Sequence, residues 1–314
     1  GDKVPNTIML TSDIAMSVDD IYQKISKEYA EDLNKLNEDF AKAWYKLTTG
    51  DMGSYHRCIG DLVPPPQAFQ NYLPASPSRL PNYVPVRMSI EVLLKISPRN
   101  VDAFINLAYR CASTFRQTDY SGGCNGARIR FLPESNYPEN NGTDKALKML
   151  EPIKKLFGRK LSWTDLIVLA GMTALESEND DLKLKFCGGG VDADRGVQDK
   201  DLSPRNYKDP LISVLDDFLV KGLTKEEGVA LACRQQVGSQ YYQNLLSNSD
   251  SYSKHERALL KDEELKKIVE LYARNENTLL RVFAGAWTKL MTADRFLDNR
   301  NNACENVDTK TKNL

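Results

Sequence analysis

Apolar residues recur at helical spacing along most of this chain. Between residues 36 and 47 the apolar and aromatic positions recur at helical spacing and share one face of a helix: Leu36, Phe40, Ala43, Trp44 and Leu47. Burial in a core is the ordinary explanation of such a stripe. Because no segment alternates polar and apolar residues over the length of a strand, the sequence predicts an all-α fold with little or no sheet.

An internal repeat organises the chain. Residues 19–51 match residues 262–294 without a gap, which indicates a duplicated pair of helices. The identical positions include Ile25/Ile268, Tyr29/Tyr272, Phe40/Phe283, Trp44/Trp287 and Leu47/Leu290. A full domain's length precedes the second copy but not the first. We therefore expect residues 1–60 to be the helical tail of a first repeat whose body is missing.

Proline-rich sequence follows the first copy. The prolines there include Pro64, Pro65, Pro66, Pro74, Pro77, Pro81 and Pro85. Because proline fixes φ and lacks a backbone donor, we interpret residues 61–99 as an irregular linker and residues 100–314 as a complete helical domain.

Capping patterns predict where helices begin. They place helix starts at Ser17, Asn100, Ser162 and Thr224, and the last of these is expected to open one helix through Leu246. The three glycines at 188–190 are interpreted as a turn. A phosphate-binding loop would need a following Lys-Ser/Thr pair or a helix start, and neither is present.

The charges of the chain are nearly balanced. A net charge of −1 at pH 7 argues against a nucleic-acid partner, and no apolar run approaches the ~20 residues of a transmembrane helix. One segment is basic, through Lys145, Lys148, Lys154, Lys155, Arg159 and Lys160. A solvated helix face is the ordinary explanation, and docking to an acidic partner or peripheral membrane association is the alternative.

Signals of cellular location are few. The chain begins Gly1-Asp2-Lys3 without an initiator Met, so either a targeting segment was removed or the chain is a piece of a longer protein. Processing would favour an organelle lumen or secretion, with the cytoplasm left open. Asn141-Gly142-Thr143 is a glycosylation sequon that matters only if the chain enters a secretory compartment.

Metal-binding patterns are absent from the sequence. The six cysteines lack C-x-x-C spacing and no His stands at zinc-finger spacing, so we expect no metal site. Cys111 and Cys124 either pair or remain two buried thiols. We interpret His56 and His255, which is expected to open the penultimate helix, as exposed or capping residues.

Several segments resemble the catalase-peroxidases, which are class I haem peroxidases. They are residues 8–29 (IMLTSDIAMSVDDIYQKISKEY) with 38–53 (EDFAKAWYKLTTGDMG), 113–137 and 161–176 (LSWTDLIVLAGMTALE), and 186–194 is similar to a family loop in altered form. Their order resembles a carboxy-terminal half preceded by the tail of an amino-terminal half. The resemblance implies the helical fold of plant-type peroxidases, in which the carboxy-terminal half normally holds no haem.

The resemblance also assigns the positions that haem chemistry uses. It places Asn106, Tyr109 and Arg110 where the catalytic half has its peroxide-cleaving Arg, Trp and His, and Arg234 where that half has its iron ligand. Asp13 matches the family's proximal Asp. An arginine stays protonated and offers no lone pair to iron. We therefore expect no haem, no catalytic residues, and a filled or narrowed pocket in which carboxylates or carbonyls partner the arginines.

These observations favour a non-catalytic structural or interaction protein, a subunit or accessory of a larger assembly of proteins. The alternatives are a haem peroxidase that removes hydrogen peroxide, or the supporting half of a catalase-peroxidase. We expect the interaction surface to be Leu36, Phe40, Trp44 and Leu47. The second repeat of the same chain is its expected main contact, because the linker keeps the effective concentration high.

Overall fold

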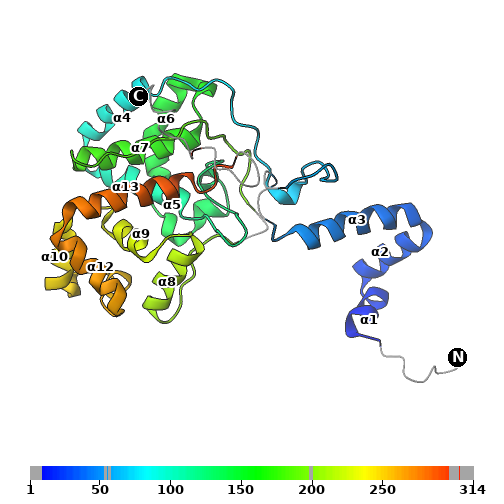
Figure 1. Cartoon of the computed structure of the whole chain (residues 1–314). Helices are drawn as coiled ribbons and strands as arrows, with labels where there is room; N and C mark the ends of the chain where they lie inside the picture. The colour runs from blue at the N-terminus through cyan, green and yellow to red at the C-terminus, as the bar shows by residue number, and fades with distance from the viewer. Residues whose placement is uncertain (1–8, 53–54, 56–57, 198–200, 297–303, 305–314) are drawn as a thin grey trace. The chain divides into compact units, whose positions relative to one another are not determined.

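The computed structural model describes residues 9–52, 55, 58–197, 201–296 and 304 (Figure 1). The chain divides into two compact units, residues 1–51 and residues 52–314. Helices account for the regular structure of both units. In the described ranges the only β pairing consists of two isolated bridges, Arg116 with Ser121 and Gly126 with Asp192. The predicted all-α fold is confirmed.

The described part of unit 1 forms three helices, α1 (Thr11–Val18), α2 (Asp20–Glu31) and α3 (Leu33–Thr49). Asp19 caps α2, because its side chain accepts hydrogen bonds from the backbone of Ile21 and Tyr22. The predicted cap, Ser17, instead lies inside α1, where its hydroxyl donates to the carbonyl of Ile14 at 2.8 Å. None of the three helices contains a buried residue.

Unit 2 contains ten α-helices among its described residues. They are α4 (Val84–Ile96), α5 (Arg99–Ala112), α6 (Thr143–Phe157), α7 (Trp163–Glu178), α8 (Pro210–Val220), α9 (Lys225–Ala230), α10 (Ser239–Ser247), α11 (Lys254–Ala258), α12 (Glu263–Arg274) and α13 (Glu276–Thr292). One short 3₁₀ helix, η2 (Ala68–Gln70), precedes α4, and the others lie between the α-helices: η3 (Arg128–Arg130), η4 (Glu134–Asn136), η5 (Pro138–Asn140), η6 (Gly158–Lys160), η7 (Leu231–Cys233) and η8 (Ser249–Ser251).

The core of unit 2 is built around α5 and α7, which pack closely together. Twelve consecutive residues of α7, Thr164 through Leu175, are buried, so this helix runs through the interior. The two helices approach closely because Gly171 has no side chain. A Cβ at that position would lie 2.3 Å from the Cβ of Ala108.

Several sequence predictions about unit 2 need correction. The expected linker, residues 61–99, contains α4, whose Val86, Ile90 and Leu94 are buried. Pro85 is compatible with this helix because it stands in the first turn, where its missing donor has no intrahelical partner. The next helix begins at Arg99, and the side chain of Asn100 donates to the carbonyl of Leu93 instead of capping it.

The third correction concerns the helix predicted from Thr224 to Leu246. Its capping box forms as expected, with Thr224 and Glu227 bonding to each other's backbone. The α-helix then ends at Ala230, tightens into η7, and resumes only at Ser239. The other predicted cap, Ser162, is confirmed, because its hydroxyl accepts from the backbone of Asp165.

Residues 188–190 do not form the predicted turn but a closely packed segment around a buried carboxylate. Asp165 accepts hydrogen bonds from the hydroxyl of Tyr83 (2.5 Å) and from the backbones of Gly189 (2.9 Å) and Gly190 (2.8 Å). A Cβ at Gly190 would lie 2.4 Å from Thr164, so the close approach requires glycine. The glycine donors thus bind a carboxylate of the protein itself.

The C-terminal end of α13 leads back to the same segment. Arg295 donates to the carbonyls of Cys187 and Gly188, each at 3.1 Å, and its guanidinium lies 4.0 Å from Asp165. A disulfide between Cys187 and Cys304 adds a covalent link across a sequence separation of 117 residues. The segment around Cys187, near the middle of unit 2, is therefore linked to the residues that follow α13.

Both copies of the internal repeat form a helix pair, as the sequence match predicts. Asp262 caps α12 through the backbones of Glu264 and Leu265, as Asp19 caps α2. The aromatic pairs are also alike. The rings of Phe40 and Trp44 stack with centroids 6.0 Å apart, and those of Phe283 and Trp287 with centroids 6.1 Å apart.

Candidate functional site

The predicted pocket residues on α5 lie one turn apart. Asn106, Tyr109 and Arg110 occupy positions i, i+3 and i+4 of the helix, and all three are half-buried. The opposite face of α5 enters the core through Phe104, Leu107 and related apolar residues. The amphipathic pattern of the sequence therefore turns the polar residues away from α7.

Arg234 approaches this helix from the break in the predicted long helix. It directly follows η7 and is half-buried. Its guanidinium carbon lies 3.9 Å from the centroid of the Tyr109 ring, which is a stacked cation–π contact. One terminal nitrogen also donates to the carbonyl of Leu231 at 3.3 Å. The helix break thus places the arginine on the aromatic ring.

A third basic residue, Lys221 at the end of α8, completes the cluster. Its ammonium lies 5.3 Å from the Tyr109 ring centroid and donates to the Tyr109 hydroxyl at 3.4 Å. It also pairs with the carboxylate of Asp217 at 2.6 Å. Sequence analysis missed Lys221, although a lysine between the apolar run Phe218–Val220 and Leu223 is a signal of an inward-facing charge.

Positive charge dominates the surroundings of Tyr109. The guanidinium of Arg110 lies 6.0 Å from the same ring. Burial lowers the pKa of Arg110, and Arg234 lowers it further by repulsion. Within the described part of the chain, the Nε atoms of Arg110 and Arg234 are buried without a hydrogen-bond partner. The structure therefore brings Tyr109, Arg110 and Arg234 together as a packed basic cluster.

The expected partners of these arginines are found only in part. Arg234 has a carbonyl partner, and Lys221, not an arginine, has the carboxylate. No ion pair to Arg110 or Arg234 occurs among the described residues. The ring of Tyr109 takes the place that we expected carboxylates to fill, because an aromatic face attracts cations without carrying a charge.

The remaining candidates lie elsewhere. Asp13 caps α1, where its carboxylate accepts from the backbone of Leu10 at 2.9 Å. His255 lies half-buried in the first turn of α11, which is followed by α12 and α13 and so is not the penultimate of the described helices. His56 lies outside the described residues. No group of three or more metal-binding side chains was found in the described ranges.

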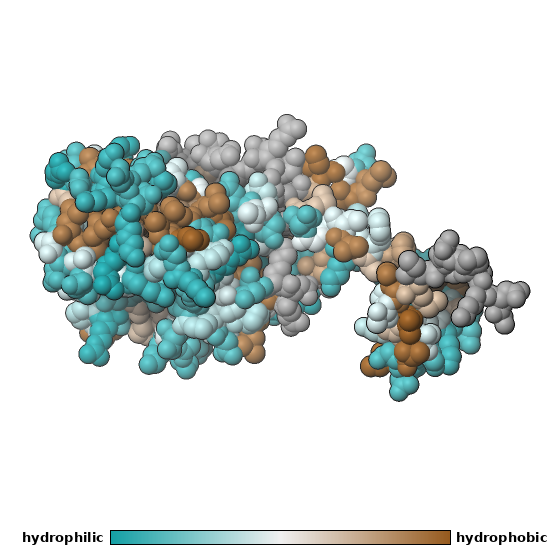
Figure 2. All heavy atoms as spheres, turned by 90° about the horizontal axis from the view of Figure 1, so that it is seen from below, coloured by the Kyte–Doolittle hydropathy of each residue, from teal (hydrophilic) through white to brown (hydrophobic). Residues whose placement is uncertain are grey.

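The predicted interaction residues are those of α3. Phe40 is 62% exposed and Trp44 57% exposed, whereas their counterparts Phe283 and Trp287 are 0% and 1% exposed. Leu47 is exposed and Leu36 half-buried. Figure 2 shows apolar side chains at the surface of unit 1, on the right of the view. This apolar surface is a candidate site for binding, not for catalysis.

The basic stretch on α6 is less charged at its surface than its sequence implies. Lys154 turns inward, donates to the carbonyl of Leu161 and lies 3.5 Å from Asp192. Lys148 pairs with Asp144 and Lys155 with Glu151 along the helix. These contacts favour a solvated helix face. None of the described helices is long and apolar enough to span a bilayer.

Comparison with known proteins places this arrangement in a family. The family model described as "Peroxidase" matches residues 86–240, from α4 to the start of α10. A catalase-peroxidase of Mycolicibacterium fortuitum is 32% identical over 92% of this chain and 48% of its own length. Another, from Acidobacterium capsulatum, is 31% identical over 92% of this chain and 49% of its own.

The chain belongs to the catalase-peroxidase family. A third relative, the catalase-peroxidase of Pseudomonas putida strain W619, is 37% identical over 61% of the chain. The chain spans about half the length of the curated catalase-peroxidases that match most of it. The alignment with the Mycolicibacterium protein runs over 361 positions, more than the 314 residues present here, so that catalase-peroxidase has segments which this chain lacks.

Proposed function

We propose that this chain is a haem-free, non-catalytic member of the catalase-peroxidase family that works as a structural module in a larger protein assembly. The observation that supports this proposal is the contact between Arg234 and Tyr109. The resemblance assigns Arg234 to the iron-ligand position and Tyr109 to a peroxide-cleaving position on the opposite side of the haem. In this chain the two side chains stack at 3.9 Å.

The residues around Tyr109 do not fit a haem. A porphyrin between α5 and η7 would have to separate Arg234 from Tyr109 and would meet a guanidinium where iron needs a lone pair. The positive charges of Arg110 and Lys221 close by would add repulsion to a ferric centre.

Haem titration tests the absence of the cofactor. We expect the purified chain to show no Soret band of its own and no saturable spectral shift when haem is added in equimolar amounts. An Arg234→His variant is the matched control, because an imidazole offers the lone pair that arginine lacks. A stoichiometric Soret band in the wild-type chain would contradict the proposal.

The proposed role also follows from the exposed face of unit 1. In unit 2, α12 packs on α9 and α10, and α13 packs on α9 and α5. The matching face of α2 and α3 has no such cover among the described residues of unit 1. In unit 2, α12 and α13 already cover the surface of α5, α9 and α10 on which such a face packs. The partner proposed here is therefore another protein domain with the same helical fold. This differs from our expectation that the second repeat is the main contact.

Docking of this face predicts a change at Trp44. Transfer of an exposed tryptophan into an apolar contact shifts its emission to the blue and shields it from acrylamide. We expect both changes when the chain joins its native assembly, and a lower native mass for a variant that combines Phe40→Ser, Trp44→Ser and Leu47→Ser. The control is Lys42→Ser, an exposed polar change on the same helix. An unchanged native mass of the triple variant would count against an interaction through α3.

A further inference from the structure

The sequon at residues 141–143 stands at an open position of unit 2. Asn141 links η5 to α6 and is exposed, as is Gly142. A Cβ at Gly142 would meet no atom within 4 Å, so the surface beside Asn141 is open. The side-chain amide of Asn141 makes no hydrogen bond among the described residues, and only its backbone nitrogen is bonded, to the carbonyl of Pro138. A large substituent on this nitrogen would displace no contact of the fold.

The third residue of the sequon serves the fold once it has formed. Thr143 is buried, and its hydroxyl donates to the carbonyl of Asn140 at 2.7 Å. Its neighbour Asn140 is also buried and donates to the carbonyl of Glu134 at 2.7 Å. Asn141, the residue that would accept a glycan, is exposed between these two anchored positions. The buried positions on either side thus hold Asn141 at the surface, in the connection between η5 and α6.

Disulfides provide an independent indication of the compartment. Cys111 pairs with Cys124, and Cys187 pairs with Cys304, while Cys58 and Cys233 are free thiols. All four paired cysteines are at most 5% exposed, so both bonds lie within the fold and not at a reactive surface. Disulfides of this kind form and persist in oxidising compartments, such as the endoplasmic reticulum lumen and the cell exterior.

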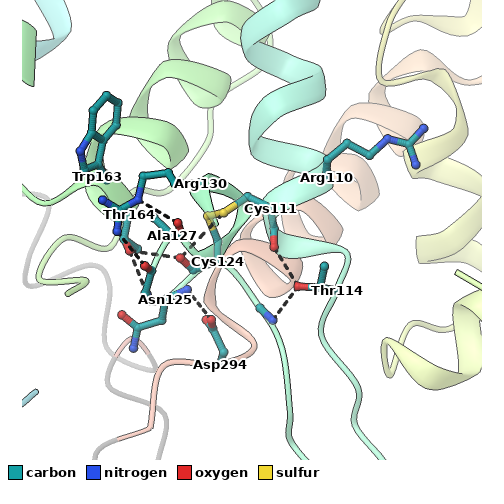
Figure 3. The surroundings of a disulfide bond; sticks show 12 residues. Arg110, Cys111, Thr114, Cys124, Asn125, Ala127, Arg130, Trp163, Thr164 and Asp294 are labelled. Atoms are coloured by element: carbon teal, nitrogen blue, oxygen red, sulfur yellow. Dashed lines mark hydrogen bonds between the residues drawn. A yellow bond between two sulfur atoms is a disulfide. The ribbon is translucent and has the colours of Figure 1, made fainter. Parts of the chain in front are cut away.

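The Cys111–Cys124 bond is built into a hydrogen-bonded junction (Figure 3). Thr164 donates to the carbonyl of Cys124 at 3.1 Å, and Thr114 donates to the carbonyl of Cys111 at 3.1 Å. Figure 3 shows Arg110 extending away from the disulfide, so the bond and the basic cluster are separate features of α5.

We propose that Asn141 carries an N-linked glycan, added as the chain passes through an oxidising secretory lumen. In this transfer the amide nitrogen of Asn141 attacks the anomeric carbon of a lipid-diphosphate-linked oligosaccharide. The bond from that carbon to the phosphate oxygen breaks, the lipid diphosphate leaves, and the amide nitrogen loses one proton. The acceptor must be used before α6 forms, because Thr143 is buried in the folded chain.

The test uses the full chain, secreted from eukaryotic cells behind a cleavable leader. A peptide:N-glycosidase should lower its mass by one glycan and convert Asn141 to Asp, which peptide mass spectrometry locates. The Asn141→Gln variant should be secreted without this shift. Thr143→Ser is the matched control, because serine keeps both the sequon and the hydroxyl that bonds to Asn140. Absence of a shift in the wild-type chain, or its persistence in Asn141→Gln, would overturn the proposal.

Thiol counting on the same secreted material tests the second premise. Alkylation of the unfolded chain should label two cysteines before reduction and all six after it, since four are paired. Six labelled cysteines without reduction would remove the support for an oxidising compartment and would also overturn the proposal. Neither measurement depends on haem, so the outcome is independent of the proposed function.

Discussion

Replacing Trp287 with alanine should lower the free energy of unfolding by about 3–5 kcal/mol, whereas the same change at Trp44 should lower it by less than about 1 kcal/mol. The two residues are equivalent in the repeat and stack on equivalent phenylalanines. They differ in surroundings, since Trp287 is 1% exposed and Trp44 57% exposed. The loss at Trp287 combines lost apolar burial with the cavity left between α13 and its neighbours.

Urea unfolding followed by circular dichroism measures both changes without relying on tryptophan emission. Trp287→Phe is the control for aromatic volume. It should be much milder than alanine, because the ring stack is kept and the indole nitrogen of Trp287 has no hydrogen-bond partner among the described residues. Equal losses at Trp44 and Trp287 would mean that the face of α3 is already packed in the purified chain.

The second large effect is expected at Asp165. Its replacement with alanine should cost about 3–5 kcal/mol, because removing one member of a buried charged cluster leaves the other uncompensated. The change would leave the backbone donor of Gly190 without an acceptor and that of Gly189 with only the Tyr83 hydroxyl at 3.1 Å, and it would leave the guanidinium of Arg295 without its nearby carboxylate. Burial raises the pKa of Asp165, and the hydrogen bond from Tyr83 opposes that rise.

A graded series separates the contributions at this carboxylate. Asp165→Asn keeps the shape but presents an amide to donors, so its loss should be intermediate. Tyr83→Phe removes one hydroxyl from the cluster and should cost about 1 kcal/mol. Chemical denaturation of the three variants gives the order. A loss below about 1 kcal/mol for Asp165→Ala would show that the glycine segment is held by packing alone.

Local sequence patterns predicted features that depend on contacts within one or two helical turns. The repeat predicted both helix pairs, and the Ser162 and Thr224 patterns placed two helix starts correctly, because caps act within one turn. The helix α4 was missed because Pro85 and its neighbours are typical of a linker. A proline in the first turn and one in a loop look alike in sequence, and only the burial of Ile90 distinguishes them.

The candidate site depended on contacts that sequence does not carry. The resemblance named Tyr109 and Arg234, but their stacking depends on the break after Ala230, where a continuous helix was predicted. Lys221 joins them from α8, and only the tertiary fold brings these segments together. The pairing of Cys187 with Cys304 was likewise beyond prediction, because 117 positions separate them and other pairings were equally allowed.

The bond between Cys187 and Cys304 makes a closed ring of the polypeptide that includes α8 to α13. A protease that cuts this ring once produces two peptides that remain one covalent molecule. Such a nicked chain migrates as a single species until a reductant is added, and only then separates at the cut. A single cut within this ring would therefore leave the basic cluster's Arg234 tethered to α5, which carries Tyr109.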